Sequence, residues 1–256
     1  MIANYHSHTT RCRHAEGTER EYIERALQGG LKILGFSDHT PYLFPGDYYS
    51  NFRMFPDQLP DYVETLEKLR REYKDRIELH IGLEVEFYPH LFGKLMDYLK
   101  GFPIEYILLG QHFLGDEQGE PASAHRTSDP QILDRYVGQV IDGMQTGLFT
   151  YLAHPDVIHY VGDDALYEKQ MRRLCRAAND CYMPVEINFL GISGNRSYPN
   201  ETYWRIAGEE GCRVVLGCDA HETQQVWHPE TLAKGEAIAR RYQLNVLETV
   251  ELVKPF

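Results

Sequence analysis

The hydrophobic residues of this chain form short apolar or β-branched runs that alternate with longer segments of helical period. Seven runs predict strands, at residues 2–6, 33–37, 77–87, 106–112, 151–154, 184–189 and 213–218. The segments between them predict helices at residues 18–28, 58–73, 89–100, 130–146, 164–181, 200–210 and 229–241. Thr18 and Glu21 have the spacing of a capping box at the start of the first helix, and Gly29 and Gly30 predict its end.

Repeated alternation of strands and helices indicates an α/β fold with a parallel sheet, either closed into a barrel or left open. No low-complexity segment or Pro/Gly linker interrupts the sequence, so we predict a single domain over residues 1–256. In a βα barrel the loops that follow the strands line one face, and functional residues gather there. The residues that end the predicted strands are therefore the first candidates for a site.

Six of the seven predicted strands end in or carry a histidine, aspartate or glutamate. These residues are His6, His8, His39, Glu84, His112, His154, Asp219 and His221, and His14 follows in the first loop. Residues two apart in an extended segment point to the same side, so His6 and His8 can face one cavity, as can Asp219 and His221. Each motif alone has a plain structural explanation, such as a buried histidine or a helix cap. Their joint position at the strand ends favours a metal cluster.

Nine candidate ligands exceed the number that one ion takes, which is about four to six. Two or three ions are implied, with at least one bridging carboxylate. Imidazole and carboxylate together suit Zn²⁺, Mn²⁺ or Fe²⁺ and do not select sharply among them. Cys12 lies between His8 and His14 and is interpreted as a buried or loop thiol rather than a thiolate ligand.

Composition narrows the class of partner. The 256 residues carry a formal net charge of -12 without a Lys/Arg block, which favours a small substrate over nucleic acid. A mean hydropathy of -0.46 and the lack of a long apolar run predict no membrane span, and the polar N-terminal segment predicts no secretory signal. Five cysteines without C-x-x-C spacing argue against a disulfide framework and predict a cytoplasmic location.

The order of these motifs resembles that of the PHP (polymerase and histidinol phosphatase) family along nearly the whole chain. The matching segments are His6-Ser7-His8, His14, Gly35-Phe36-Ser37-Asp38-His39, Gly82-Leu83-Glu84, His112, Ala153-His154-Pro155 and Asp219-Ala220-His221. The resemblance implies a distorted (β/α)7 barrel with three divalent metal ions (Zn, Mn and/or Fe) at the C-terminal ends of its strands.

The resemblance also implies how the ligands are shared among the ions. His6, His8, Glu84 and Asp219 would hold the first ion, and Glu84 would bridge to a second ion held by His112 and His154. His14, His39 and His221 would hold the third. Glu84, Asp219 and His221 are the predicted catalytic residues. Asp219 or His221 would protonate the leaving group, but both are also predicted ligands, so the general acid stays open.

The segments around His14, Pro41-Tyr42, Glu186-Ile187-Asn188 and Arg196 resemble those of the histidinol phosphatases within the family. The expected reaction is hydrolysis of L-histidinol phosphate by a hydroxide that two metals share. Arg196 is the first candidate for binding the phosphate, since a guanidinium matches phosphate bidentately, and Asn188 is the second substrate-binding candidate. The alternatives are a phosphoesterase of the same family acting on nucleotides or other esters, and a non-catalytic metal-binding module. The sequence does not predict the oligomeric state.

Overall fold

The computed structural model describes residues 1–256, and all of its strand pairs are parallel. One sheet has the order β1-β2-β3-β4 and a second has the order β5-β6-β7. The strands are β1 (Ala3–Asn4), β2 (Ile33–His39), β3 (Glu78–Val85), β4 (Tyr106–Leu109), β5 (Val185–Asn188), β6 (Arg213–Gly217) and β7 (Asn245–Val246).

Three isolated bridges, at two places, join these sheets into a barrel. Leu152 pairs with Leu109 at the end of β4 and with Val185 of β5, so a single residue takes the place of the predicted strand 151–154. Ser7 pairs with Ala220, which connects the first strand to the segment after β6. The predicted distorted (β/α)7 barrel is confirmed. Its fifth strand is shorter than predicted because the backbone turns at His154, whose φ is 31°.

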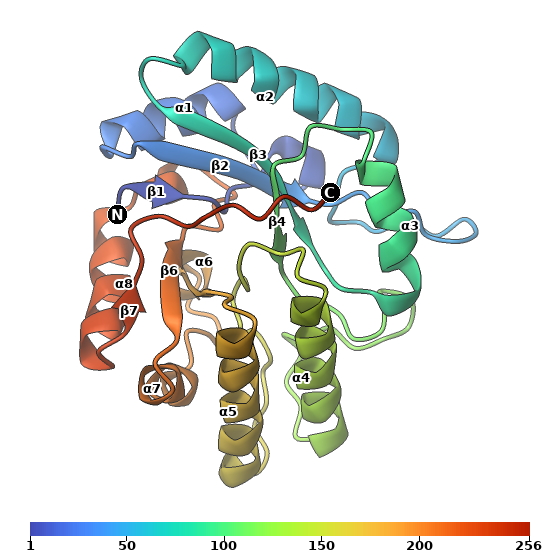
Figure 1. Cartoon of the computed structure of the whole chain (residues 1–256), viewed down its shortest axis with the longest axis vertical. Coiled ribbons are helices and arrows are strands. Elements are labelled where there is room, and N and C mark those ends of the chain that lie inside the picture. The colour runs from blue at the N-terminus through green and yellow to red at the C-terminus, as the bar shows by residue number, and fades with distance from the viewer.

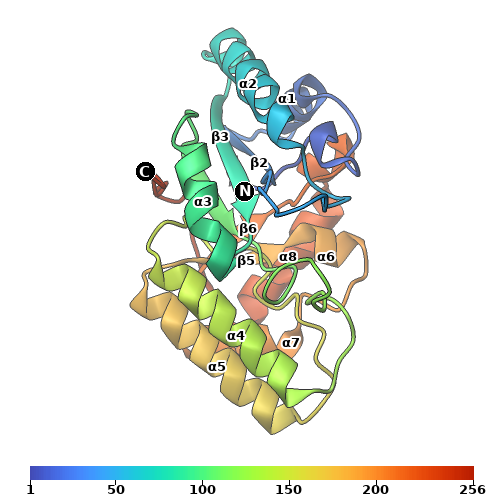
Figure 2. The ribbon, with the colours of Figure 1, turned by 90° about the vertical axis from the view of Figure 1, so that its right-hand side faces the viewer.

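The helices surround the strands (Figures 1 and 2), and α4 and α5 lie side by side. They are α1 (Glu19–Gln28), α2 (Leu59–Tyr73), α3 (Pro89–Leu99), α4 (Pro130–Gln145), α5 (Asp164–Asp180), α6 (Phe189–Ser193), α7 (Glu201–Glu209) and α8 (Pro229–Arg241). Seven of them match the predicted helices within one or two residues. The short helix α6, strand β7 and the 3-10 helices η1 (Thr10–Cys12), η2 (Pro56–Gln58) and η3 (Thr223–Val226) were not predicted.

Polar side chains determine where several helices begin. Thr18 and Glu21 form the predicted capping box of α1, with each side chain accepting a backbone N–H. Asp163 caps α5 and Asn200 caps α7 in the same manner, by accepting amides of the first turn. Because these caps fix the helix starts, they also fix the lengths of the βα loops that carry the candidate site.

The interior of the barrel is filled by a small apolar cluster that includes Tyr106, Leu108, Tyr151 and Val215. The last segment of the chain, which follows β7, runs across the strands and packs Leu247, Val250 and Leu252 against this cluster (Figure 1). The opposite, C-terminal ends of the strands therefore remain as the face on which polar residues converge. None of the helices is both long and apolar enough to cross a bilayer.

Candidate metal centre

The structure brings all nine predicted ligands into one cluster at the C-terminal ends of the strands. Ligand atoms within 4.8 Å of one another occur in the sets His6/His8/Asp219, His6/Glu84/His154, His8/His39/Glu84 and His14/His39/His221. His112 joins them through Glu84, whose Oε1 lies 3.5 Å from His112 Nε2 and 2.8 Å from His154 Nε2. Glu84 is thus central to the cluster, as expected of a bridging carboxylate.

An unusual backbone conformation directs two of these side chains, His154 and Asp219, towards the cluster. His154 and Asp219 have φ values of 31° and 49°, in the left-handed region that non-glycine residues rarely adopt. Such conformations persist where the surrounding structure holds them, and they cluster at functional sites. Gly110 leaves room for the central carboxylate, because a Cβ at this position would lie 2.0 Å from Glu84 Oε1.

Buried carboxylates orient two of the imidazoles by hydrogen bonds to the ring nitrogen that faces away from the cluster. Glu186 Oε1 lies 2.8 Å from His6 Nδ1, and Glu86 Oε1 lies 2.8 Å from His112 Nδ1. A carboxylate accepts a hydrogen bond, so in each pair Nδ1 carries the proton and Nε2 offers its lone pair to the cluster. Asp38 Oδ1 is 3.4 Å from His8 Nδ1 and completes this outer layer.

The charges of the cluster influence one another strongly. Burial raises the pKa of Glu84, but the imidazoles of His112, His6 and His39 lower it well below its usual range. Burial opposes protonation of His6, yet Glu186, Asp219 and Glu84 raise its pKa well above the usual value. The carboxylates are therefore ionised and attract positive charge. Without metal, protons on the imidazoles supply this charge, and metal ions would supply it by displacing those protons.

The polar atoms at the centre of the cluster point to metal binding. The Nε2 atoms of His6, His8 and His221, Nδ1 of His39 and Oε2 of Glu84 are buried and make no hydrogen bond of ordinary geometry, although His8 Nε2 lies 3.0 Å from Asp219 Oδ1 and His39 Nδ1 lies 3.1 Å from Glu84 Oε2. Such atoms are rarely left without partners in proteins, because each would lose the hydrogen bond it makes to water. Imidazole nitrogens and ionised carboxylates are the donors that Zn²⁺, Mn²⁺ and Fe²⁺ take. The residues present thus fit a cluster of divalent ions.

Cys12 lies beside this cluster, since its Sγ is within 4.8 Å of ligand atoms of His8 and His221. The side chain is completely buried, and burial raises the pKa of the thiol. A neutral thiol is a weak ligand, so the geometry favours the predicted buried thiol.

A cavity of about 420 Å³ opens directly from the cluster. His14, His39, His112, Asp219 and His221 form its polar side, and Arg196 is the only lysine or arginine that lines it. The Phe52 and Phe113 rings form part of the wall and stack at a centroid distance of 5.8 Å. The cavity therefore places a cation, an aromatic surface and the ligand cluster around one small volume.

Asn188 does not line this cavity. Its Nδ2 donates to Glu186 Oε2 and Asp219 Oδ2 at 2.8 and 3.0 Å, and its Oδ1 accepts the amide of Gly191. All of these groups belong to the protein, and the side chain is buried. This geometry favours a role for Asn188 in holding Asp219 rather than the predicted contact with a substrate.

The sequence profile of the PHP domain matches residues 4–189, which is most of the chain. The chain belongs to the PHP family. A relative from Deinococcus radiodurans named "Probable histidinol-phosphatase" is 29% identical over 88% of this chain and 88% of its own length. The Bacillus subtilis histidinol-phosphatase is 26% identical over 86% of this chain and 94% of its own length.

The fold of this PHP protein also matches a solved structure. The crystal structure of a histidinol phosphate phosphatase from Lactococcus lactis, complexed with zinc, L-histidinol and phosphate, superposes with a TM-score of 0.77. The match covers 99% of this chain and 98% of that one at 20% sequence identity. At this identity the comparison supports the fold, and the chemistry of this chain depends on its own residues.

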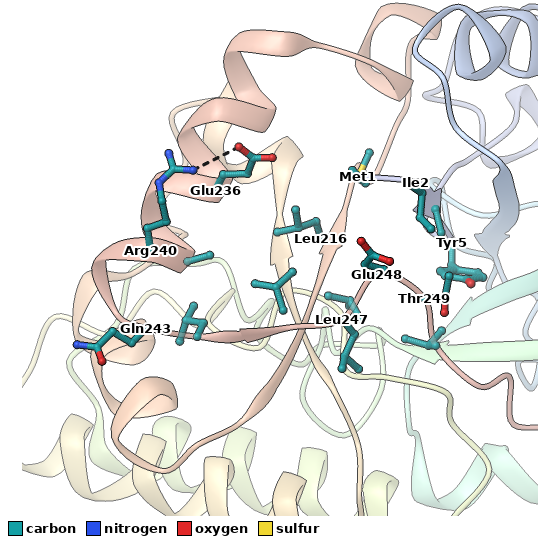
Figure 3. Close-up of a pocket in the computed structure, with 16 residues that line it drawn as sticks. Met1, Ile2, Tyr5, Leu216, Glu236, Arg240, Gln243, Leu247, Glu248 and Thr249 are labelled. Atoms are coloured by element: carbon teal, nitrogen blue, oxygen red, sulfur yellow. Dashed lines mark hydrogen bonds and ion pairs between the residues drawn. The ribbon is translucent and has the colours of Figure 1, made fainter.

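A second cavity, of about 460 Å³, lies beside β1, β6, β7 and α8 and contains none of the predicted site residues (Figure 3). Its lining is mostly apolar, with Met1, Ile2, Leu216 and Leu247 among the residues, and the Glu236–Arg240 pair lies at one end. No histidine lines this second cavity.

Proposed function

We propose that this PHP protein is a metal-dependent phosphomonoesterase that hydrolyses L-histidinol phosphate to L-histidinol and phosphate. The observation that carries the proposal is the buried cluster of unpartnered imidazole and carboxylate atoms that opens into a cavity with one arginine. Relatives with histidinol-phosphatase names, matched over most of their length, support the choice of ester.

The ligand sets follow the arrangement expected for the family. His6, His8, Glu84 and Asp219 would hold one ion, Glu84, His112 and His154 a second, and His14, His39 and His221 a third. When bound, divalent ions (Zn, Mn and/or Fe) would lower the pKa of a water shared by two of them, so that it attacks phosphorus, and would neutralise the phosphoryl oxygens.

Side chains of the protein would bind the phosphate and hold the ligands in position. Arg196 lines the cavity and would bind non-bridging phosphate oxygens, and its Nη1 donates to the Tyr198 hydroxyl at 3.1 Å. Glu186 and Glu86 fix the proton on Nδ1 of His6 and His112, so that neither ring turns when the substrate enters. Asp219 and His221 line the cavity beside the leaving alkoxide, but both are also proposed ligands, so the general acid stays open.

The test is phosphate release from a panel of esters by the purified protein, with and without a chelator. The panel contains L-histidinol phosphate, nucleotides, sugar phosphates and a 3′-phosphorylated oligonucleotide. A kcat/KM for L-histidinol phosphate that exceeds the others by orders of magnitude, and that chelation abolishes, supports the proposal. A nucleotide or oligonucleotide as the best substrate would replace histidinol phosphate while leaving the metal site in place.

A further inference from the structure

The cavity beside the ligand cluster contains one acidic group that the proposed chemistry does not use. Apart from the predicted ligands, the charged side chains of its lining are Arg196 and Glu222. Arg196 is the proposed phosphate ligand, which leaves Glu222 as the one charged side chain of the lining without a role in the proposed chemistry.

The backbone and neighbours of Glu222 hold it in place. It directly follows His221 and caps the 3-10 helix η3. Gln225 Oε1 accepts the amides of both His221 and Glu222, at 2.7 and 3.1 Å, and Gln224 donates a hydrogen bond to the Glu222 carboxylate. The carboxylate therefore has a defined position one residue from a predicted metal ligand.

No cation of the protein neutralises this carboxylate. Glu222 takes part in none of the ion pairs of the structure, although most of the other glutamates that are not predicted ligands have an arginine or histidine partner within reach. It is half-buried, and it also lines the adjoining cavity of about 300 Å³, where Gln224 and His228 are further polar groups. A partly buried anion without a cationic partner is a binding position for an incoming cation.

We infer that Glu222 is a specificity residue that binds an ammonium group on the alcohol part of the substrate. The inference rests on the proposed function and names the residue by which the site would prefer the phosphate of an amino alcohol over other esters. Arg196 then binds the phosphate and Glu222 the ammonium group of such a substrate. The Phe52 and Phe113 rings contact its uncharged part. A glutamate that is merely solvated at the cavity mouth would give no preference for an amine.

The test compares two esters that differ only in the amine. L-Histidinol phosphate and its deamino analogue, 3-(imidazol-4-yl)propyl phosphate, are assayed with the metal-loaded wild-type protein and with Glu222→Gln. The expected result is a ratio of kcat/KM values, amine over deamino, that falls by about 10- to 100-fold in the variant, the scale of a charge-assisted hydrogen bond. Glu230→Gln, an exposed glutamate of α8 outside the cavity, is the charge-matched control and should keep the wild-type ratio.

A second measurement reports on binding of the alcohol without its phosphate. Competitive inhibition by L-histidinol should weaken by a similar factor in Glu222→Gln, and Glu222→Asp should fall between the two proteins because it keeps the charge one methylene farther away. Metal content, measured by mass spectrometry, shows whether each variant retains its ligand cluster.

The failures of the two proposals are distinguishable. Wild-type protein that is inactive on L-histidinol phosphate, but active on another ester of the panel, overturns the proposed substrate. The amine and amine-free forms of that other ester then test Glu222 separately. Active wild-type protein whose amine preference is unchanged in Glu222→Gln overturns the role of Glu222 and leaves the phosphatase assignment standing.

Discussion

Arg53 Nη2 lies 3.0 Å from Glu86 Oε1, and both side chains are completely buried. The same guanidinium bonds the Glu117 carboxylate and donates to the carbonyl of Thr40 at 2.9 Å. Glu86 in turn holds His112. Arg53 is buried and does not line the cavity, so it connects three βα loops to the predicted ligand His112 and does not contact a substrate.

The buried position of Arg53 leads to the first prediction. Arg53→Met leaves Glu117 buried without a counter-charge and Glu86 with His112 alone, and breaking such a buried pair typically costs about 3–5 kcal/mol. We expect the free energy of unfolding, measured in urea, to fall by this amount. Arg173→Met is the control, because Arg173 and its partner Asp134 are exposed and such pairs contribute below about 1 kcal/mol. Equal losses in both variants would contradict the buried network.

Gly110 gives a prediction about the bridging carboxylate. Gly110→Ala places a Cβ where Glu84 Oε1 now lies, so we expect Glu84 to be displaced and metal content and phosphatase activity to fall at least tenfold. Gly138→Ala in α4 is the matched control, since nothing lies within 4 Å of its Cβ position and alanine favours helix by about 1 kcal/mol. A Gly110→Ala protein with full metal content would refute the central position of Glu84.

Arg196 is predicted to act on substrate binding rather than on the metal cluster. Arg196→Ala should raise KM by about 10- to 100-fold, as expected for the loss of a charge-assisted hydrogen bond, with metal content unchanged. Arg135→Ala removes an arginine that pairs with Glu120 outside the cavity and should leave KM as it is. Unaltered kinetics in Arg196→Ala would remove this residue from the site.

Glu105 provides a prediction for pH that is remote from the ligands. Burial raises the pKa of Glu105, but hydrogen bonds from His80 and the Ile81 amide and the charge of Arg70 lower it below its usual value. A lowered folded-state pKa means that the unfolded chain binds the proton more tightly. The resulting stability is present above the unfolded pKa, about 4.3, and is lost as the pH falls through the folded value.

We therefore expect Glu105→Gln to reduce the free energy of unfolding at pH 7 by about 1 kcal/mol. The difference from wild type should shrink towards pH 3.5, as followed by urea unfolding at each pH. Glu64→Gln, an exposed glutamate of α2, should show no such pH-dependent difference. A gap for Glu105→Gln that stays constant with pH would contradict the lowered pKa.

The sequence predicted most of the barrel because its strands and helices carry clear hydrophobic periods and caps. The positions of His6, His8 and Asp219 followed from strand ends and two-residue spacing. Other features depend on contacts between distant segments. Glu186 illustrates this limit, because the strand pattern predicts only that its position is buried and not that it contacts His6. Phe52 lies in a loop whose path no hydrophobic period predicts. Asn188 lies at a strand end like the ligands, yet its amide donates a hydrogen bond to Asp219, a contact that the sequence does not predict.

The bridge between Ser7 and Ala220 has a consequence for the order of synthesis. His6 and His8 leave the ribosome first, whereas Asp219 and His221 follow only after more than 200 further residues. A nascent chain that has not reached β6 therefore carries seven of the nine predicted ligands without Asp219 and His221, which complete the cluster. Metal acquisition by this protein is expected to be post-translational, and a chain halted before β6 should bind divalent ions loosely and without selectivity.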